Sequence, residues 1–185
     1  SVNASHRGGY PHQRPAYIKH DLDFQGVTAT ETWFEGDVFQ GAAAYYPDGA
    51  DPIIVVSVGG RMFTVQPTSG YRVNNILPPM DLITDTHKAW FTQVEKWLIK
   101  QNGIDAPIIF DGATCRRPAT DEIGCGTCGV YAWGRYWYSM PNGIEYRASD
   151  LVYGDGNRED VLKITENTFL NGGGNFSVPG GAGHI

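Results

Sequence analysis

The sequence lacks the features that mark membrane segments and the common catalytic sites. No apolar run in its 185 residues approaches the roughly 18 residues of a membrane-spanning helix. No basic stretch precedes an apolar core near the N-terminus, so a signal peptide is absent or already removed. The chain has no G-x-S-x-G elbow and no P-loop. We therefore expect a protein without a membrane span, without a cofactor and without enzymatic activity.

Basic residues are too few for a general nucleic-acid binder. Lys and Arg number 14 against 20 Asp and Glu, which gives a formal net charge of −6. Proteins that bind nucleic acid or anionic membranes gain most of their affinity by neutralising phosphates with basic side chains. We therefore expect no nucleic-acid partner.

Apolar residues are abundant enough for a single domain with a buried core. They make up 41% of the chain, and its 24 Gly and 11 Pro interrupt nearly every stretch. Residues 1–20 show no periodicity and are expected to form an extended arm, and residues 169–185 are expected to form a Gly-rich tail or linker. The domain between them, residues 21–168, is expected to be rich in β-structure.

Paired β-branched segments joined by turn residues predict hairpins. The clearest joins residues 53–58 to 61–65 through Gly59-Gly60. Further candidates are the segments 107–117 and 130–147, with shorter strands at 151–153 and 161–164. We expect a mainly β fold, a β-sandwich of the jelly-roll type, with propeller-like sheets as the alternative. Apolar spacing between Trp90 and Gln101 also indicates one helix near residues 87–101, with a buried strand over 96–100 as its rival.

Three cysteines allow at most one disulfide within the chain. A structural disulfide from Cys115 to Cys125 or Cys128 is expected, with buried thiols as the next interpretation. The spacing Cys125-Gly-Thr-Cys128 supplies at most three zinc ligands when Cys115 is included, and a structural zinc site needs four. No metal site is therefore expected there.

Acidic residues suggest two weaker sites. Residues 155–166 place oxygen ligands at alternate positions as a calcium loop does, but Asp160 stands where that loop requires Gly. Carboxylates that could pair for glycoside hydrolysis are Asp105 with Asp111 and Glu145 with Asp150. A solvated turn and ordinary surface acids are the preferred interpretations.

Several arginines lie in or near the aromatic-rich segment 131–138 and could form a basic patch. They are Arg116, Arg117, Arg135 and Arg147. Salt bridges or stacking on aromatic rings are their usual role, and an interface is the second interpretation.

The two ends of the chain carry candidate modification sites and apolar anchors. Asn3 and Asn175 each begin a glycosylation sequon. The residues expected to contact other copies are Tyr10, Tyr17, Ile18, Phe176 and Val178.

Short motifs in a fixed order resemble a family of tailed-bacteriophage virion or tail structural proteins. They are Asn3-Ala-Ser5, Arg7-Gly-Gly9, Arg14-Pro-Ala-Tyr17, Phe39-Gln-Gly-Ala42, Val56-Ser-Val-Gly-Gly-Arg61, Pro107-Ile-Ile-Phe-Asp-Gly-Ala113, Arg116-Arg117, Gly134-Arg135, Asn142-Gly143, Ala148-Ser-Asp150, Thr165-Glu-Asn-Thr168 and Phe176-Ser-Val-Pro179. The chain departs from the family at the cysteine-containing segment 124–129, and members of the family tend to continue beyond the position of Ile185. The resemblance implies a non-enzymatic particle component and supplies no catalytic residue.

These observations favour a structural subunit that assembles with copies of itself, and with other virion proteins, into a symmetric virion, tail or extracellular filament. The arm would add a strand to an exposed sheet edge of a neighbouring copy. The alternative is an aromatic-rich β-module that binds carbohydrate or a cell-surface receptor, with the aromatic residues from Tyr131 to Tyr138 exposed. A hydrolase acting through a carboxylate pair is a third, weaker interpretation.

Overall fold

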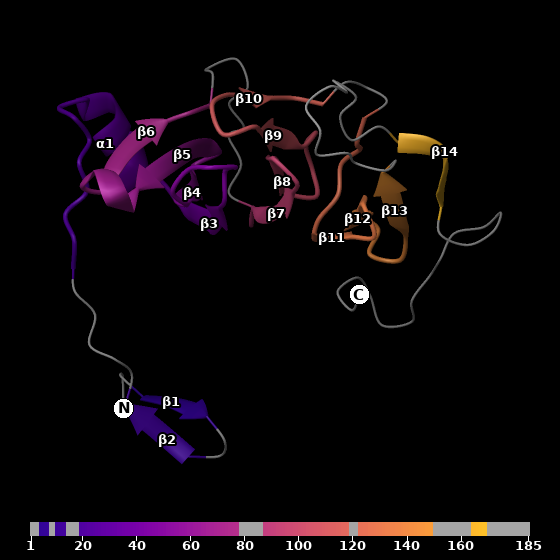
Figure 1. Ribbon diagram of the computed structural model, residues 1–185, viewed down its shortest axis with the longest axis horizontal. Helices are drawn as coiled ribbons and strands as arrows, with labels where there is room; N and C mark the ends of the chain where they lie inside the picture. The colour runs from indigo at the N-terminus through magenta and orange to yellow at the C-terminus, as the bar shows by residue number, and fades with distance from the viewer. Residues whose placement is uncertain are drawn as a thin grey trace.

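The protein is mainly β, as the sequence predicts. The structure, a computed structural model, describes residues 4–7, 10–13, 19–77, 87–118, 122–149 and 164–169. Within these ranges the chain forms one α-helix, three four-stranded antiparallel sheets and a separate two-stranded hairpin. Figure 1 shows the three sheets side by side in a row.

Each sheet is a meander whose strand order follows the chain. The first sheet contains β3 (Phe39–Tyr45), β4 (Ile53–Val58), β5 (Arg61–Gln66) and β6 (Arg72–Asn75), with the short 3-10 helix η1 (Pro67–Ser69) before β6. The second contains β7 (Trp90–Val94), β8 (Trp97–Gln101), β9 (Ile108–Phe110) and β10 (Cys115–Arg116). The third contains β11 (Gly129–Ala132), β12 (Arg135–Ser139), β13 (Tyr146–Ser149) and β14 (Ile164–Phe169).

Apolar clusters hold the layers together face to face. Helix α1 (Thr28–Gly36) and the segment before it cover the outer face of the first sheet, where Phe34 packs edge-on against Phe63. Tyr45, Met62, Leu98 and Phe110 belong to the cluster between the first and second sheets. The cluster between the second and third sheets is formed by Val94, Trp97, Ile99, Ile109, Ile123, Tyr136 and Tyr138.

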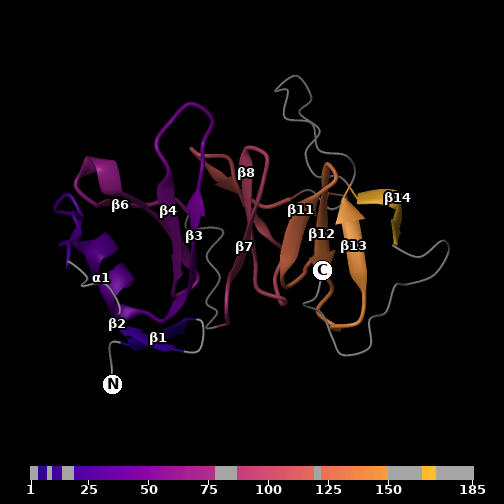
Figure 2. The ribbon, with the colours of Figure 1, turned by 60° about the horizontal axis from the view of Figure 1, so that its bottom comes forward.

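The first strands of the three sheets lie beside one another, β3 next to β7 and β7 next to β11 (Figure 2). Ala89 donates its backbone N–H to the carbonyl of Gln40 at 3.0 Å, and Thr92 Oγ1 donates to the carbonyl of Gly129 at 3.1 Å. Stacked layers are the packing of a sandwich. We call β3, β7 and β11, the strands that lie beside one another, the inner strands. Each sheet is a four-stranded meander that starts at its inner strand, a strand order found in propeller-like sheets and different from the Greek key of a jelly roll.

The predicted hairpins are present. Gly59 and Gly60 both have positive φ, 55° and 78°, as the two-residue loop between β4 and β5 requires. Strand β9 pairs with β10, and β12 pairs with both β11 and β13. Of the two shorter predicted strands, 151–153 lies outside the described residues, as do residues 161–163 of the second. Strand β14 shares only Ile164 with that predicted segment.

The predicted helix near residues 87–101 is wrong. Residues 90–94 and 97–101 form the hairpin β7–β8, in which Trp90 pairs with Gln101 and Val94 with Trp97. Every residue of β8 is buried because sheets pack on both of its faces, which removes the alternation that identifies a strand in a sequence. The rival prediction of a buried strand over 96–100 is confirmed. The helix of the described chain lies at Thr28–Gly36 instead.

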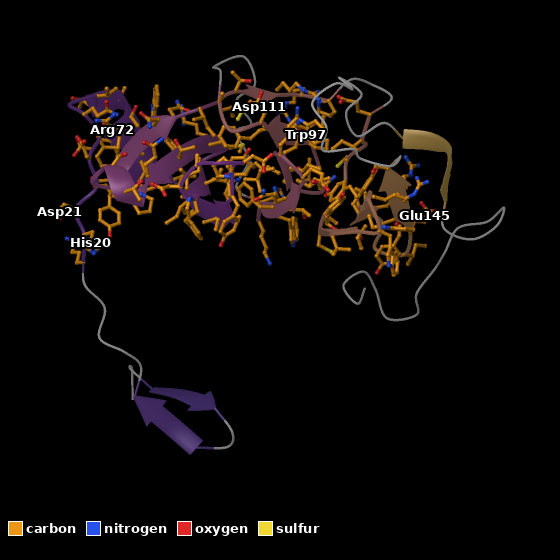
Figure 3. All side chains as sticks on the ribbon, viewed as in Figure 1. His20, Asp21, Arg72, Trp97, Asp111 and Glu145 are labelled. Carbon is orange, nitrogen blue, oxygen red and sulfur yellow. The ribbon has the colours of Figure 1, made fainter. Side chains whose placement is uncertain are left out.

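The N-terminal segment contains regular structure where an extended arm was predicted. Strands β1 (Ala4–Arg7) and β2 (Tyr10–Gln13) pair with each other, and Arg7 lies opposite Tyr10 at the turn end. Figure 1 shows this hairpin well apart from the three sheets. Residue His20 already belongs to the main body, since its ring stacks on Tyr71 at 4.3 Å between centroids, and Figure 3 shows it at that end of the row.

Candidate binding rim

Most of the predicted end anchors and modification sites lie outside the described residues. These are Tyr17, Ile18, Phe176 and Val178, the sequon residues Asn3 and Asn175, and residues 155–163 of the candidate calcium loop. Tyr10 lies in β2.

The predicted disulfide is not formed, because sheet packing separates the cysteines. All three are thiols. Cys115 is buried in the cluster between the first and second sheets. Cys125 and Cys128 lie on the other side of the second sheet, near Tyr138 and Tyr136 respectively. Burial, followed by the nearby carboxylate of Asp105, raises the pKa of the Cys125 thiol, which makes it a weak nucleophile.

Within the described ranges, no three His, Cys, Asp or Glu side chains are grouped so as to hold a metal ion. The same ranges contain no helix with the length and apolar character to cross a bilayer.

The arginines considered for a basic patch make contacts within the molecule. Arg116 forms a two-pronged ion pair with the buried Glu122, with N–O distances of 2.7 and 2.8 Å. Arg117 donates to the carbonyl of Ala106, and Arg135 donates to that of Ser149 at 2.7 Å. These contacts agree with the salt-bridge interpretation for Arg116 and with a structural role for Arg117 and Arg135.

The carboxylates considered for hydrolysis shape turns. Asp111 accepts the backbone N–H groups of Ala113 and Thr114 at 2.8 and 2.7 Å, which lowers the pKa of its carboxyl group despite partial burial. Asp105 accepts from the amide of Asn102 at 3.0 Å. Asp150, the predicted partner of Glu145, is outside the described residues.

The aromatic strand divides between core and surface. Tyr136 and Tyr138 are fully buried, their rings stack 5.3 Å apart, and burial raises the pKa of both hydroxyls. The idea that all aromatic residues from Tyr131 to Tyr138 are exposed platforms is therefore wrong. Trp133 is different, since 84% of it is exposed.

Trp133 lies on a rim formed where the three inner strands end. We define the strand-end rim as five residues at or just beyond the C-terminal ends of β3, β7 and β11. Gln93 and Tyr131 are the next-to-last residues of β7 and β11, and Tyr46, Glu95 and Trp133 directly follow β3, β7 and β11. Gln93 joins the first two sheets here: its side-chain amide accepts from Tyr46 N at 2.9 Å and donates to Tyr46 O at 2.8 Å. We call this pair of hydrogen bonds the clamp at Tyr46. It fixes the backbone of Tyr46, while Tyr46 as a whole remains 62% exposed.

Glu95 joins the second and third sheets at the same rim. Tyr131 donates its hydroxyl to the Glu95 carboxylate. Burial, together with this hydrogen bond and the negative charge of Glu95, raises the pKa of Tyr131 to about 12. Glu95 itself is exposed and has φ 48°, in the left-handed region that non-glycine residues rarely adopt.

The backbone of Trp133 is also in the left-handed region. Its φ is 53°, and Gly134 follows with φ 72°, so both central residues of the β11–β12 turn are left-handed. The Trp133 ring packs edge-on against Trp137, with centroids 6.2 Å apart, and Trp137 Nε1 donates to the carbonyl of Ala132 at 3.1 Å. A large apolar side chain is thus presented to solvent from a strained turn.

Sequence reasoning missed Gln93, Glu95 and the clamp at Tyr46 because residues 87–101 were read as a helix. The turn between β7 and β8 is Glu95-Lys96, which lacks the Gly or Asn that normally marks a two-residue hairpin loop. The aromatic and β-branched residues on either side of it were the available signal. Comparison with family models, with curated proteins and with solved structures finds no match to this chain.

Proposed function

We propose that this chain is a non-enzymatic structural subunit that assembles with copies of itself into a larger symmetric particle, and that its N-terminal hairpin is the connector. A virion or tail component of a bacteriophage is the setting that the sequence resemblance favours, and an extracellular filament is the other. The observation that carries the proposal is the separation of the β1–β2 hairpin from the three sheets in Figure 1.

A hairpin of this size needs a partner. Each strand has four residues, and an isolated two-stranded hairpin is at best marginally stable in water. Packing on a neighbouring copy would supply the further contacts that a two-stranded hairpin needs for stability. The open edges of β1 and β2 also retain the predicted capacity for strand addition.

Contacts of this kind repeat from one copy to the next. A connector from one copy that binds a different surface of the next is a heterologous contact, which generates a ring when the rotation closes and a helical filament when it does not. The proposed assembly therefore has one of these two forms.

Removal of residues 1–18 tests the proposal. This deletion keeps His20 on Tyr71 and the bridge between Asp23 and Arg72, so the body retains its contacts. We expect the full chain to assemble and the shortened chain to sediment as a monomer with the same thermal midpoint. Assembly of the shortened chain at the concentration where the full chain assembles would contradict the hairpin as connector.

A further inference from the structure

The backbone of the N-terminal hairpin has two open edges, and Pro11 makes them unequal. In the β1–β2 ladder Pro11 lies opposite His6. Opposite residues of an antiparallel ladder alternate between pairs that exchange two hydrogen bonds and pairs whose N–H and C=O groups point away from each other. Pro11 has no N–H, so its pair with His6 is of the second kind. The N–H and C=O of His6 therefore point outward, away from β2.

The edge of β1 keeps a donor and an acceptor at each of its outward positions. The same alternation turns the N–H and C=O groups of the Ala4–Gln13 pair outward. Ala4 and His6 therefore supply two donors and two acceptors on β1, whereas Pro11 supplies no donor on β2. Proline at an edge is one of the devices by which proteins prevent further strand pairing. Of the two edges, β1 is therefore the one that can join another sheet.

Among the described strands, one outer sheet edge matches β1 in length. Inner strand β7 contacts both β3 and β11, and the outer edges of the three sheets are β6, β10 and β14. The edge of β6 already pairs with Asp23, whose N–H donates to Tyr71 O at 3.2 Å and whose carbonyl accepts from Val73 N at 2.8 Å. Strand β10 has two residues and β14 has six. Strand β14 is therefore the outer edge of the described sheets that can match all four residues of β1.

Strand β14 has the features of an edge that accepts a further strand. Its sequence, Ile-Thr-Glu-Asn-Thr-Phe, is rich in β-branched residues and contains no Lys, Pro or Gly. Lys and Pro are among the residues that protect an edge against pairing. On its other side β14 pairs with β13 at Arg147–Phe169 and Ser149–Ile164, with a register shift between these pairs. Because this ladder is interrupted, β14 gains stability from a second paired strand.

The distribution of charge favours pairing of the hairpin with the body over pairing between two hairpins. Residues 1–20 contain three basic residues, Arg7, Arg14 and Lys19, and no acidic one. Since the whole chain has a formal net charge of −6, the other 165 residues carry −9. Two N-terminal segments therefore repel each other, whereas each is attracted to the body of another copy.

We infer that β1 of one copy pairs with the open edge of β14 in the next copy, so that the third sheet continues into the hairpin of its neighbour. This inference rests on the proposed assembly function and names the two strands that meet. Main-chain hydrogen bonds hold such a junction, as they do wherever a strand is added to a sheet edge. The added hairpin turns its β2 edge outward, where Pro11 lacks a donor. Each junction therefore ends at β2 and joins one hairpin to one sheet.

Hydrogen exchange of the unmodified full chain locates the junction. Backbone amides that enter a new ladder exchange more slowly, so peptides from the chain are compared by mass spectrometry below and above the threshold concentration for assembly. We expect the amides of residues 4–7 and 164–169 to exchange at least ~10-fold more slowly after assembly. Residues 72–75 of β6 and 115–116 of β10 are the control edges, and their exchange is expected to stay unchanged. This result does not depend on how a substitution affects folding.

Substitutions at two opposite positions of the hairpin separate its edges. His6→Pro removes the outward N–H of β1 and no hydrogen bond between β1 and β2. It is expected to raise the protein concentration at half assembly at least ~10-fold in sedimentation velocity. His6→Ala keeps that N–H and is expected to assemble as the unmodified chain does. Pro11→Ala restores a donor on the β2 edge, which the junction does not use, and is expected not to weaken assembly.

Three outcomes would overturn the inference. Slower exchange at residues 4–7 without a change at 164–169 would show that the hairpin binds another surface or another hairpin. If deletion of residues 1–18 abolishes assembly while His6→Pro leaves it intact, the hairpin connects copies without adding a strand, so the proposed function stands and the junction is wrong. If the unmodified chain does not assemble at any concentration, the proposed function fails and the inference fails with it.

Discussion

Tyr131 donates its hydroxyl to the carboxylate of Glu95, a residue 36 positions earlier in the chain and in the adjacent sheet. Sheets that follow one another in the chain are thus joined by polar contacts at their rim as well as by apolar clusters between their faces. The contact holds the carboxylate of a strained, exposed turn in a defined position.

Alkaline titration tests this contact. Burial and Glu95 raise the pKa of Tyr131 from 10.0 to about 12, so folding favours the protonated hydroxyl. The resulting stabilisation is complete below pH 10 and is lost as the pH rises through about 12. We expect the absorbance difference at 295 nm between the unmodified chain and Tyr131→Phe to have its midpoint near pH 12. In Glu95→Gln the Tyr131 midpoint should fall toward 10; an unchanged midpoint would exclude Glu95 as a cause.

Gly129 lies too close to Tyr136 to accept a side chain. A Cβ there would stand 2.5 Å from Cε2 of the Tyr136 ring, which is fixed by its bond to Gln101 Oε1 at 2.9 Å and by stacking on Tyr138. We expect Gly129→Ala to lower the free energy of unfolding by about 2 kcal/mol in urea titration. Gly36→Ala, which adds a methyl group with no atom within 4 Å, should change it by less than about 0.5 kcal/mol. Equal effects of the two substitutions would contradict the close approach of the Tyr136 ring to Gly129 within the third sheet.

The Arg116–Glu122 pair is expected to contribute to stability because one partner is buried. The Glu122 side chain is 5% exposed and that of Arg116 is 41% exposed, so loss of Arg116 leaves a buried carboxylate without its guanidinium partner. We expect Arg116→Met to cost about 2 kcal/mol of unfolding free energy. Asp37→Asn is the comparison, because the Asp37 side chain is 43% exposed and water compensates the loss of its charge, so the cost should stay below about 1 kcal/mol. A smaller loss for Arg116→Met than for Asp37→Asn would contradict the burial of Glu122.

The three cysteines are expected to behave as separate thiols. Cys115 is buried between the first two sheets, so iodoacetamide should leave it unmodified in the native protein and label it in urea, as measured by mass spectrometry of peptides. Reductant should leave the thermal midpoint unchanged. A peptide pair linked through Cys115 under non-reducing conditions would show that the sheets do not separate the sulfurs as described.

Hairpins with a glycine loop were predictable from local chemistry. Gly59-Gly60 marked the β4–β5 hairpin, and Gly134 and Asn142 accompany the turns on either side of β12. The β7–β8 hairpin was not predictable in the same way. Its turn residue Glu95 adopts a left-handed conformation without being Gly or Asn, and every residue of β8 is buried.

The strand-end rim was only partly foreseeable. Aromatic residues around Trp133 were recognisable as candidates, but the burial of Tyr136 and Tyr138 depends on the sheet that packs against them. The hydrogen bonds between Gln93 and Tyr46 join residues 47 positions apart, and a local sequence pattern does not predict a contact between residues so far apart in the chain. The cysteine arrangement depends on tertiary packing in the same way, since the second sheet stands between Cys115 and the other two.

Negative-stain electron microscopy of the purified full chain over a range of concentrations is the most direct test of self-assembly. The proposed function predicts rings or helical filaments with a regular repeat, formed above a threshold concentration. Single particles of 20.3 kDa at every concentration would contradict it.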